Sequence, residues 1–218
     1  MEEDCLNPEE VLAQIAAEVA VCQKCELHFS RKNSVPGEGP AIADIMLIGE
    51  GPGFYENEQG RPFVGAAGKL LEDLLGQAGL KRTEVWIGNV VKCRPPGNRD
   101  PQPEELAACD EYLERQIRAI NPRVIISLGR YSMIKFMPEA KISQVHGQMR
   151  RIGNHFVIAM YHPAAALHQP KFKEPLLADF ARLPQMLEQA RRAMAELAQV
   201  DKQEPEGPKE DPRQLNLF

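Results

Sequence analysis

The sequence contains no run of eighteen consecutive apolar residues, and it does not begin with the basic and then apolar segment of a secretory signal. A helix needs about 20 mostly apolar residues to cross a bilayer, so no membrane span is predicted. The first ten residues, MEEDCLNPEE, are acidic instead. We therefore expect a protein that has no membrane partner and works in the cytoplasm.

The sequence also lacks internal repeats and the common phosphate-binding loops. The glycine-rich stretch that begins at Gly49, GEGPGFYENEQGRPFVGAAGKLL, fits neither GxGxxG nor GxxxxGK followed by Ser or Thr, which argues against a nucleotide cofactor. Its glycines still allow the backbone to approach a ligand closely. A simple turn would explain Gly51 and Gly53, but not the carboxylate of Glu50 at the end of an apolar run.

Size and charge indicate one globular domain with two tails. The chain has 218 residues, of which 43% are hydrophobic and 26% charged, which is enough for one α/β core. We predict an acidic tail over residues 1–10, a domain over residues 11–200, and a disordered tail over residues 201–218. The net charge is −5, but the tails carry −5 and −2, which leaves +2 on the domain. DNA therefore stays open as a partner.

Four short, nearly continuous apolar runs, at residues 44–49, 85–91, 123–129 and 155–161, predict strands that are buried on both faces. Helix-like stretches lie between them, and an amphipathic segment at residues 176–200, interrupted at Pro184, follows. This alternation predicts a single three-layer α/β domain with a central four-stranded, mostly parallel sheet. Ligands of such sheets lie at the carboxyl ends of the strands, where polar residues follow three of the four runs.

The five cysteines indicate a metal site or a reactive thiol, because disulfides are rare in a reducing cytosol. Cys22 and Cys25 form a CxxC pair, whereas fifteen residues separate Cys93 from Cys109. Zinc ribbons usually take both halves from close pairs, and an iron–sulfur cluster accommodates more widely spread thiolates, so the spacing mildly favours the cluster over zinc. The alternative is that Cys93 and Cys109 are buried structural thiols. Cys5 fits no spacing pattern.

Several long motifs occur in a fixed order along the chain. A CxxC pair is followed by GEGPG, GRPFVGAAGKLL, NVVKCRPPGNRDPQPEE and YHP. Over about residues 11–195, this order resembles the family 4 uracil-DNA glycosylases. The resemblance implies a monomeric prokaryotic DNA-repair enzyme that excises uracil from DNA, works on the nucleoid, and has the uracil-DNA glycosylase fold. It also implies a 4Fe-4S cluster with the ligands Cys22, Cys25, Cys93 and Cys109. We expect the role of this cluster to be structural, because nothing else in the chain resembles an electron-transfer partner site.

The resemblance further implies a pocket for an extruded uracil. Asn89 would donate to uracil O4 and accept from N3–H, a pattern that cytosine reverses. Phe63 would stack on the base, and His162 would donate to O2 as charge develops on the leaving group. Glu50 would orient the attacking water or offset charge on the sugar. The implied substrate-binding residues are Gly49, Glu50, Gly51, Phe63, Asn89 and His162, with Glu50 and His162 catalytic.

Other residues are weaker candidates around this pocket. Glu56 is a second acidic candidate, and Leu167 is a possible wedge into the base stack. Four basic residues near strand ends are candidate contacts to DNA phosphates, namely Lys92, Arg94, Arg99 and Arg130.

Two other functions compete with uracil excision. A catalytically inactive iron–sulfur protein, either an electron carrier or a DNA-damage sensor, should lack a catalytic position, yet all the implied pocket residues are present. A relative that traps its substrate through a histidine after the second strand is not favoured, because CRPPGNRDPQPEE contains no histidine.

The last five residues, QLNLF, place an apolar cluster after a polar stretch. They resemble the bacterial sliding-clamp-binding motif, in which a glutamine and apolar residues enter a pocket of the clamp. A sliding clamp is therefore an expected partner, contacted through Gln214, Leu215, Leu217 and Phe218. The alternative is a tail that folds back on the domain.

Overall fold

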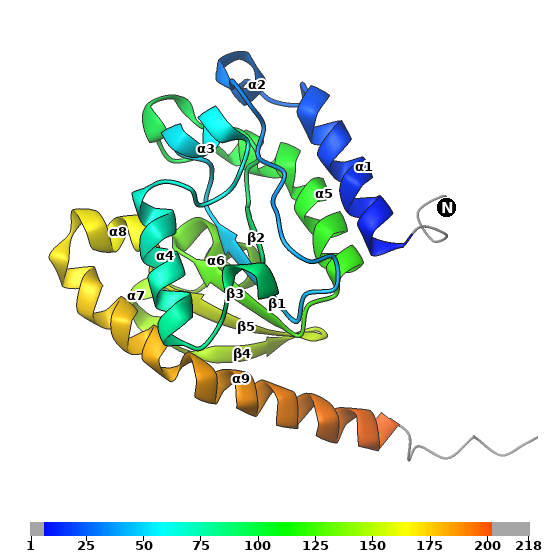
Figure 1. Cartoon of the computed structure of the whole chain (residues 1–218), viewed down its shortest axis with the longest axis vertical. Coiled ribbons are helices and arrows are strands. Elements are labelled where there is room, and N and C mark those ends of the chain that lie inside the picture. The colour runs from blue at the N-terminus through cyan, green and yellow to red at the C-terminus, as the bar shows by residue number, and fades with distance from the viewer. Residues whose placement is uncertain (1–6, 202–218) are drawn as a thin grey trace, which may run out of the picture.

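The computed structural model of this protein describes residues 7–201. A five-stranded sheet in the order β2–β1–β3–β5–β4 forms their centre (Figure 1). Four strands are parallel, namely β1 (Ile45–Gly49), β2 (Trp86–Asn89), β3 (Val124–Leu128) and β5 (His155–Met160). The predicted α/β class and mostly parallel sheet are confirmed. The sheet has five strands rather than four, because β4 (Met149–Ile152) pairs antiparallel with β5.

The fifth strand escaped prediction because its sequence, MRRI, is not an apolar run. As the edge strand it has one hydrogen-bonded neighbour, β5, and its two arginines are exposed. Charged residues are common on edge strands, where they discourage pairing with other chains. The turn that joins β4 to β5 contains Gly153 at a φ of 57°, a left-handed conformation that suits glycine.

Helices cover both faces of the sheet (Figure 1). Alternation along the strands sends Leu47 and Ile126 into one core, and Met46 and Ile125 into the other. The first core is closed by α4 (Ala66–Gln77), α8 (Pro163–His168) and α9 (Lys173–Asp201). The second is closed by α5 (Pro103–Ile120), α6 (Arg130–Phe136) and α7 (Ile142–Val145). The fold is therefore the three-layer arrangement that the sequence predicted.

An additional helix, α1 (Pro8–Val21), packs on the outer side of α5. It begins inside the segment expected to be an acidic tail. A reciprocal cap fixes this start, because Asn7 Oδ1 accepts from the Glu10 backbone N–H at 2.9 Å and the Glu10 carboxylate accepts from the Asn7 N–H at 3.0 Å. Residues 1–6 and 202–218 lie outside the described residues, so the tail boundaries and the QLNLF motif stay predictions.

The long terminal helix α9 continues through Pro184, where the sequence predicted an interruption. Proline inside a helix costs about 3 kcal/mol, because it removes one backbone hydrogen bond and crowds the preceding turn. Phe180, Leu183 and Leu187 are buried against the sheet around this point, and their burial offsets that cost. Within residues 7–201, no helix is both long enough and apolar enough to cross a membrane.

Short elements occupy several of the connections between the strands and the longer helices. The loop after β1 leads into α3 (Phe54–Gln59), and a further turn leads into α4. The segment before β2 contains a 3₁₀ turn, η2 (Arg82–Glu84), and the loop after β2 contains another, η3 (Pro96–Asn98). The helix α2 (Leu27–Ser30) follows the CxxC pair, and η4 (Pro170–Phe172) joins α8 to α9.

Candidate functional site

A pocket of about 350 Å³ lies at the carboxyl ends of the parallel strands. Its walls come from the loop after β1, the loop before α4, the end of β2, η3, and the start of α8. The structure brings five of the six expected substrate-binding residues into this lining, namely Glu50, Gly51, Phe63, Asn89 and His162. Gly49, the sixth, is the last residue of β1 and lies directly behind them.

The Asn89 side chain is 2% exposed, and its Oδ1 has no hydrogen-bond partner among the described residues. Leaving a buried acceptor unpaired costs about 1–3 kcal/mol, so a ligand that donates a hydrogen bond to this atom would recover that cost. Gly49 pairs with Asn89 across the two strands, and a Cβ at Gly49 would lie 2.4 Å from this Oδ1. Glycine at position 49 therefore leaves room for the Asn89 amide at the pocket wall.

Phe63 and His162 form a second wall of the pocket. Their rings are stacked with centroids 5.6 Å apart and an interplanar angle of 27°. The edge of Phe63 also faces Gly49, where a Cβ would lie 2.7 Å from Phe63 Cζ. The pocket therefore offers a flat aromatic face beside the unpaired Asn89 acceptor.

His162 is the N-cap of α8, and its Nδ1 accepts from the Ala164 backbone N–H at 3.1 Å. This bond leaves the ring hydrogen on Nε2. Burial lowers the pKa of His162 to about 4, although the Glu56 carboxylate opposes this shift. The imidazole is therefore neutral at physiological pH and acts as a hydrogen-bond donor through Nε2. Gly129, at a φ of 92°, lets β3 approach it closely, since a Cβ there would lie 3.1 Å from His162 Cβ.

Glu50 follows β1, and its half-buried side chain lines the pocket. Burial raises the pKa of this carboxyl group to about 7; the Asp100 carboxylate raises it further, and the Arg130 guanidinium opposes both. Asp100 and Arg130 form an exposed ion pair at 2.7 Å. Glu50 can therefore gain or lose a proton near neutral pH.

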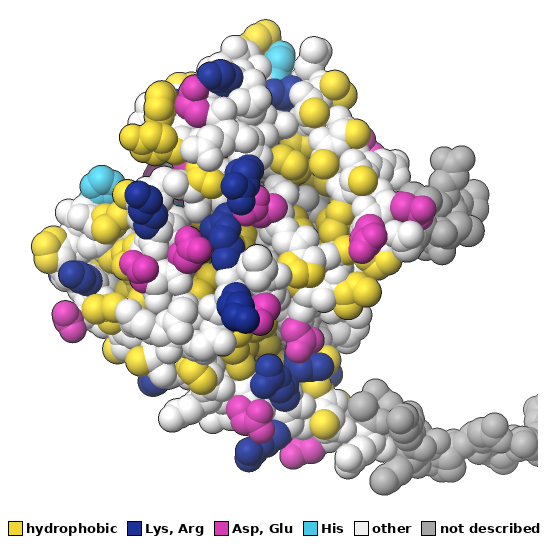
Figure 2. All heavy atoms as spheres, in the orientation of Figure 1, with side chains coloured by type: hydrophobic (Ala, Val, Ile, Leu, Met, Phe, Trp, Pro, Cys, Tyr) yellow, Lys and Arg dark blue, Asp and Glu magenta, His cyan; other side chains and the backbone are white. Residues whose placement is uncertain are grey.

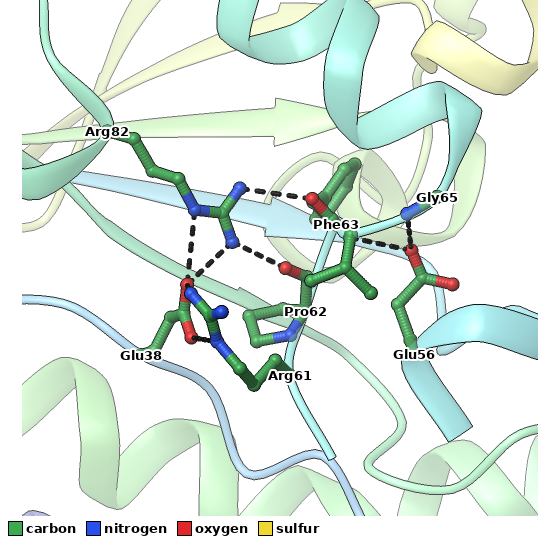
Figure 3. Close-up of polar contacts among 8 residues, drawn as sticks. Glu38, Glu56, Arg61, Pro62, Phe63, Gly65 and Arg82 are labelled. Carbon is green, nitrogen blue, oxygen red and sulfur yellow. Dashed lines mark hydrogen bonds and ion pairs between the residues drawn. The ribbon is translucent and has the colours of Figure 1, made fainter. Parts of the chain in front are cut away.

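Glu56, the second acidic candidate, has its carboxylate engaged by the backbone. It accepts from the N–H groups of Gly53 at 3.1 Å, Val64 at 2.9 Å and Gly65 at 3.0 Å. Figure 3 shows this carboxylate directed at the segment that carries Phe63. The geometry gives Glu56 a bracing role in the loop before α4.

The structure corrects one candidate phosphate contact. Lys92 is only 1% exposed, and its Nζ donates to the Asn89 carbonyl at 2.9 Å and to Gln116 Oε1 at 2.7 Å. It therefore holds β2 to α5 and cannot reach DNA.

The other three basic candidates keep more solvent access, and each has a partner. Arg94 bonds Asn98 at 2.7 Å, Arg99 pairs with Glu105 at 2.6 Å, and Arg130 pairs with Asp100 as described. Leu167 on α8 is 49% exposed, as a side chain that enters a base stack must be. On the face drawn in Figure 2, Lys and Arg side chains are mixed with Asp and Glu side chains.

The sequence did not single out every part of the pocket. Pro95, Ala164 and Ala165 also line it; Pro95 comes from the loop that follows β2, and the two alanines come from α8, which follows β5. Their positions shortly after the apolar runs were the one available signal.

All four cysteines of the expected ligand set line a second, small cavity. Cys22 and Cys25 lie between α1 and α2, Cys93 follows β2, and Cys109 is on α5. All four are free thiols, and Cys93 and Cys109 are buried. Arg31 donates to Cys93 Sγ at 3.4 Å. The described residues include no group of three or more His, Cys, Asp or Glu side chains arranged to hold a metal ion.

The chemistry of this donor set suits a metal cluster. Burial raises the pKa of Cys25 and Cys93 and raises that of Cys109 to about 11. These thiols are therefore protonated until a metal displaces the proton. Four thiols from three segments supply the ligand number of a thiolate-bound cluster, and the Arg31 guanidinium places a hydrogen-bond donor beside one of the sulfurs.

Comparisons with known proteins agree on one family. The sequence model of the uracil DNA glycosylase superfamily matches residues 36–183. A protein of Archaeoglobus fulgidus named type-4 uracil-DNA glycosylase is 45% identical over 186 residues, which cover 81% of this chain and 94% of that protein. Proteins of the same name are 47% identical in Saccharolobus solfataricus, over 79% of this chain and 85% of that protein, and 46% identical in Thermotoga maritima, over 73% and 84%.

Proposed function

This chain belongs to the uracil-DNA glycosylase superfamily and, within it, to the type-4 uracil-DNA glycosylases, and we propose that it hydrolyses the N-glycosidic bond of uracil in DNA. The products are free uracil and an abasic site. The observation that carries the proposal is the unpaired Oδ1 of Asn89, buried beside a flat aromatic wall in a pocket of about 350 Å³.

Recognition of the base follows from the Asn89 amide. Oδ1 accepts the hydrogen of uracil N3, and the Nδ2 hydrogens donate to O4. Cytosine has no hydrogen at N3 and carries an amino group at C4. Its N3 acceptor would therefore face the Oδ1 acceptor, and its amino donor would face the Nδ2 donor. A site built to make a hydrogen bond rejects a base that leaves its buried group unpaired.

The extruded base is held by stacking on Phe63. Each base that stacks on an aromatic side chain gains about 1–3 kcal/mol. This gain offsets part of the cost of taking the nucleotide out of the duplex. A stacked base beside the Asn89 wall also presents its O2 toward the side occupied by His162, which shares the Phe63 wall.

Bond cleavage leaves negative charge on the uracil ring and positive charge on the sugar. Neutral His162 donates from Nε2 to O2 and stabilises the departing anion without first having to lose a proton. Glu50 in its ionised form orients the attacking water and offsets the charge on the sugar. Its proton equilibrium near neutral pH gives the reaction a pH dependence.

We further propose that Cys22, Cys25, Cys93 and Cys109 hold a 4Fe-4S cluster. The proposal is supported by four free thiols on one cavity and by the Arg31 contact to Cys93. When bound, the cluster supplies a structural link between α1, the loop after β2, and α5. Lys92 connects this region to the pocket, because it bonds the Asn89 carbonyl and precedes Cys93 in the chain.

Three finer proposals concern where and with what the protein works. We propose a monomer in the prokaryotic cytoplasm that associates with the nucleoid when it binds DNA.

The third proposal is that the C-terminal QLNLF segment binds the sliding clamp, which raises the enzyme's effective concentration at newly replicated DNA. Deleting residues 214–218 should abolish binding to the clamp of the same species and leave excision on free oligonucleotides unchanged. Equal clamp binding by both forms, or none by either, would contradict the clamp proposal.

The test of the main function uses oligonucleotides that are identical except for one base. The protein is incubated with single-stranded and double-stranded substrates containing uracil, cytosine or thymine at that position, and alkali then cleaves the strand at abasic sites. We expect cleavage at uracil alone. The alternative, an inactive electron carrier or damage sensor, is not favoured and predicts no cleavage with any substrate.

A further inference from the structure

Phe63 has an unusual backbone conformation for a bulky residue. Its φ is 50°, in the left-handed region, although it is neither Gly, Asn nor Asp. Such a conformation is strained for a residue with a side chain and persists only where the surrounding structure holds it. A Cβ at Gly68 would lie 1.9 Å from the Phe63 carbonyl oxygen, so the first turn of α4 also lies against this segment. Some contact must keep the strained conformation in place.

Arg82, from the 3₁₀ turn η2, supplies that contact. Its Nη1 donates to the Phe63 carbonyl at 3.1 Å, and its Nη2 donates to the Pro62 carbonyl at 2.5 Å. The side chain is 17% exposed, so these bonds form mostly out of water. Figure 3 shows the guanidinium lying across the two successive carbonyls. A planar guanidinium can bond both carbonyls and a carboxylate together, which an ammonium cannot do in the same geometry.

Glu38 holds the other edge of Arg82. Its Oε1 accepts from Arg82 Nε at 3.1 Å and from Nη2 at 2.6 Å. Burial favours a higher pKa for Glu38, but hydrogen bonds and charges from Arg61 and Arg82 keep the pKa below its ordinary value. The carboxylate is therefore ionised and remains a partner for Arg82 at neutral pH.

The backbone of Glu38 is fixed to the sheet. It exchanges two hydrogen bonds with Ile87 of β2, at 2.9 and 2.8 Å. Gly37 and Gly39 on either side lie against Trp86, so closely that a Cβ at either would lie within 2.5 Å of it. Glu38 is thus a rigid anchor on the edge of the sheet, and Arg82 connects that anchor to the Phe63 backbone.

The segment is held from its other side by Glu56, which accepts from the N–H groups of Val64 and Gly65. Figure 3 shows the two carboxylates on opposite sides of Phe63, one acting through Arg82 and the other directly. Phe63 thus lies between two charged braces that bond its own carbonyl and the backbone on either side of it.

We propose that Arg82 is a positioning residue for base excision, which fixes the Phe63 ring in the pocket by holding the carbonyls of Pro62 and Phe63, and that Glu38 orients Arg82 for this task. This inference rests on the proposed uracil-excision function. Arg82 itself does not line the pocket, so its effect on catalysis passes through the ring.

Arg61 provides a matched control. It donates to the same Glu38 carboxylate, from Nε at 2.8 Å and from Nη2 at 3.1 Å, and neither bond involves the Phe63 carbonyl. Arg61→Lys and Arg82→Lys each retain one positive charge beside Glu38. They differ in whether the bonds to the two carbonyls are affected. Arg82→Lys also keeps the positive charge beside Glu38, so it is the variant to use if Arg82→Ala does not fold.

The first experiment measures single-turnover excision on a uracil oligonucleotide over a range of protein concentrations. A misplacement of about 1 Å can cost about 10²-fold in rate, and a smaller displacement costs less. We expect Arg82→Lys to lower the maximal rate by about tenfold, with the half-saturating concentration within about twofold, and Arg61→Lys to stay near wild type. In a Phe63→Ala background, Arg82→Lys should cause no further loss, because the ring it positions is gone.

A second readout does not depend on activity. Because the Phe63 and His162 rings are stacked at 5.6 Å, their aromatic NMR signals report the ring position. These signals should shift in Arg82→Lys and not in Arg61→Lys. Equal behaviour of the two variants in both assays, or an undiminished loss from Arg82→Lys when Phe63 is absent, would overturn the positioning role. If the wild type excises no uracil but the aromatic signals still shift in Arg82→Lys, the proposed function is refuted and the positioning of Phe63 by Arg82 stands.

Discussion

Replacing Glu50 with glutamine should make the protein more stable and less active, both in a pH-dependent way. Burial is the main cause that raises the pKa of Glu50 from its ordinary value of 4.5 to about 7. Between these two values the folded protein holds a proton that the unfolded chain has lost. The free energy of unfolding therefore falls as pH rises through this interval, and the loss is complete above about pH 7. Glutamine has no charge to bury at any pH.

The magnitude follows from the same two values. At about 1.4 kcal/mol for each pH unit, the full interval from 4.5 to about 7 corresponds to about 3 kcal/mol. The side chain is half-buried and partly solvated, so we expect about 1–2 kcal/mol. Glu50→Gln should therefore exceed wild type in stability by about 1–2 kcal/mol at pH 8 and by much less at pH 4.5.

The stability assay is urea denaturation of both proteins at pH 4.5 and pH 8. Glu104→Gln is the control, because that carboxylate is exposed in the first turn of α5. An equal stability difference between Glu50→Gln and wild type at the two pH values would refute the reasoning. If ionised Glu50 orients the attacking water as proposed, its replacement should lower excision at pH 8 by about 10²-fold or more. The wild-type rate should rise with pH through about 7, and the remaining rate of Glu50→Gln should not.

Other predictions concern the donor, the cluster and the buried lysine. His162→Ala should lower uracil excision by about 10²-fold at unchanged fold, because it removes a donor to the developing charge; full activity in this variant would contradict the assigned role. The purified protein should absorb broadly near about 400 nm, and Cys109→Ala should lose that absorbance; a colourless wild type that contains one zinc per chain would refute the cluster. Lys92→Met should lower the free energy of unfolding by about 1–3 kcal/mol, because it leaves the Asn89 carbonyl and Gln116 Oε1 without their donor; denaturant unfolding measures this, and an unchanged midpoint would contradict it.

Much of the fold was predictable because the four parallel strands are buried on both faces. Such strands consist of nearly continuous apolar residues, and that pattern is visible without any long-range information. β4 has no such signal, since its MRRI sequence is half exposed at the sheet edge. The path of α9 through Pro184 was equally hidden, because local propensity favours a break and only packing of Phe180 and Leu183 on the sheet opposes it.

The pocket residues that lie in short motifs at strand ends could be predicted from the sequence. Glu50, Asn89 and His162 each follow or end an apolar run, and the parallel sheet brings these ends to one edge. The motif around Phe63 could be recognised, but its strained backbone could not, because no residue type in GRPFVG requires it.

Long-range contacts explain what the sequence did not reveal. Arg82 reaches the Phe63 carbonyl from nineteen residues away, and a bond from a side chain to a backbone carbonyl leaves no periodic or spacing signal. Lys92 lies in a loop rich in proline and charge, so it was expected to be exposed. Its burial depends on Gln116 of α5, which only the folded chain brings to it.

The central claim is that the Asn89 amide recognises an extruded uracil and that the protein then releases this uracil from the DNA. The most direct measurement is the amount of free uracil released in a single turnover from an oligonucleotide with one deoxyuridine, by wild type and by Asn89→Ala of equal folded fraction. We predict release by the wild type and a loss of about 10²-fold or more in the variant, because the contact matters most as charge develops on the base. Absence of uracil release by the wild-type protein, or equal rates for the two proteins, would contradict the claim.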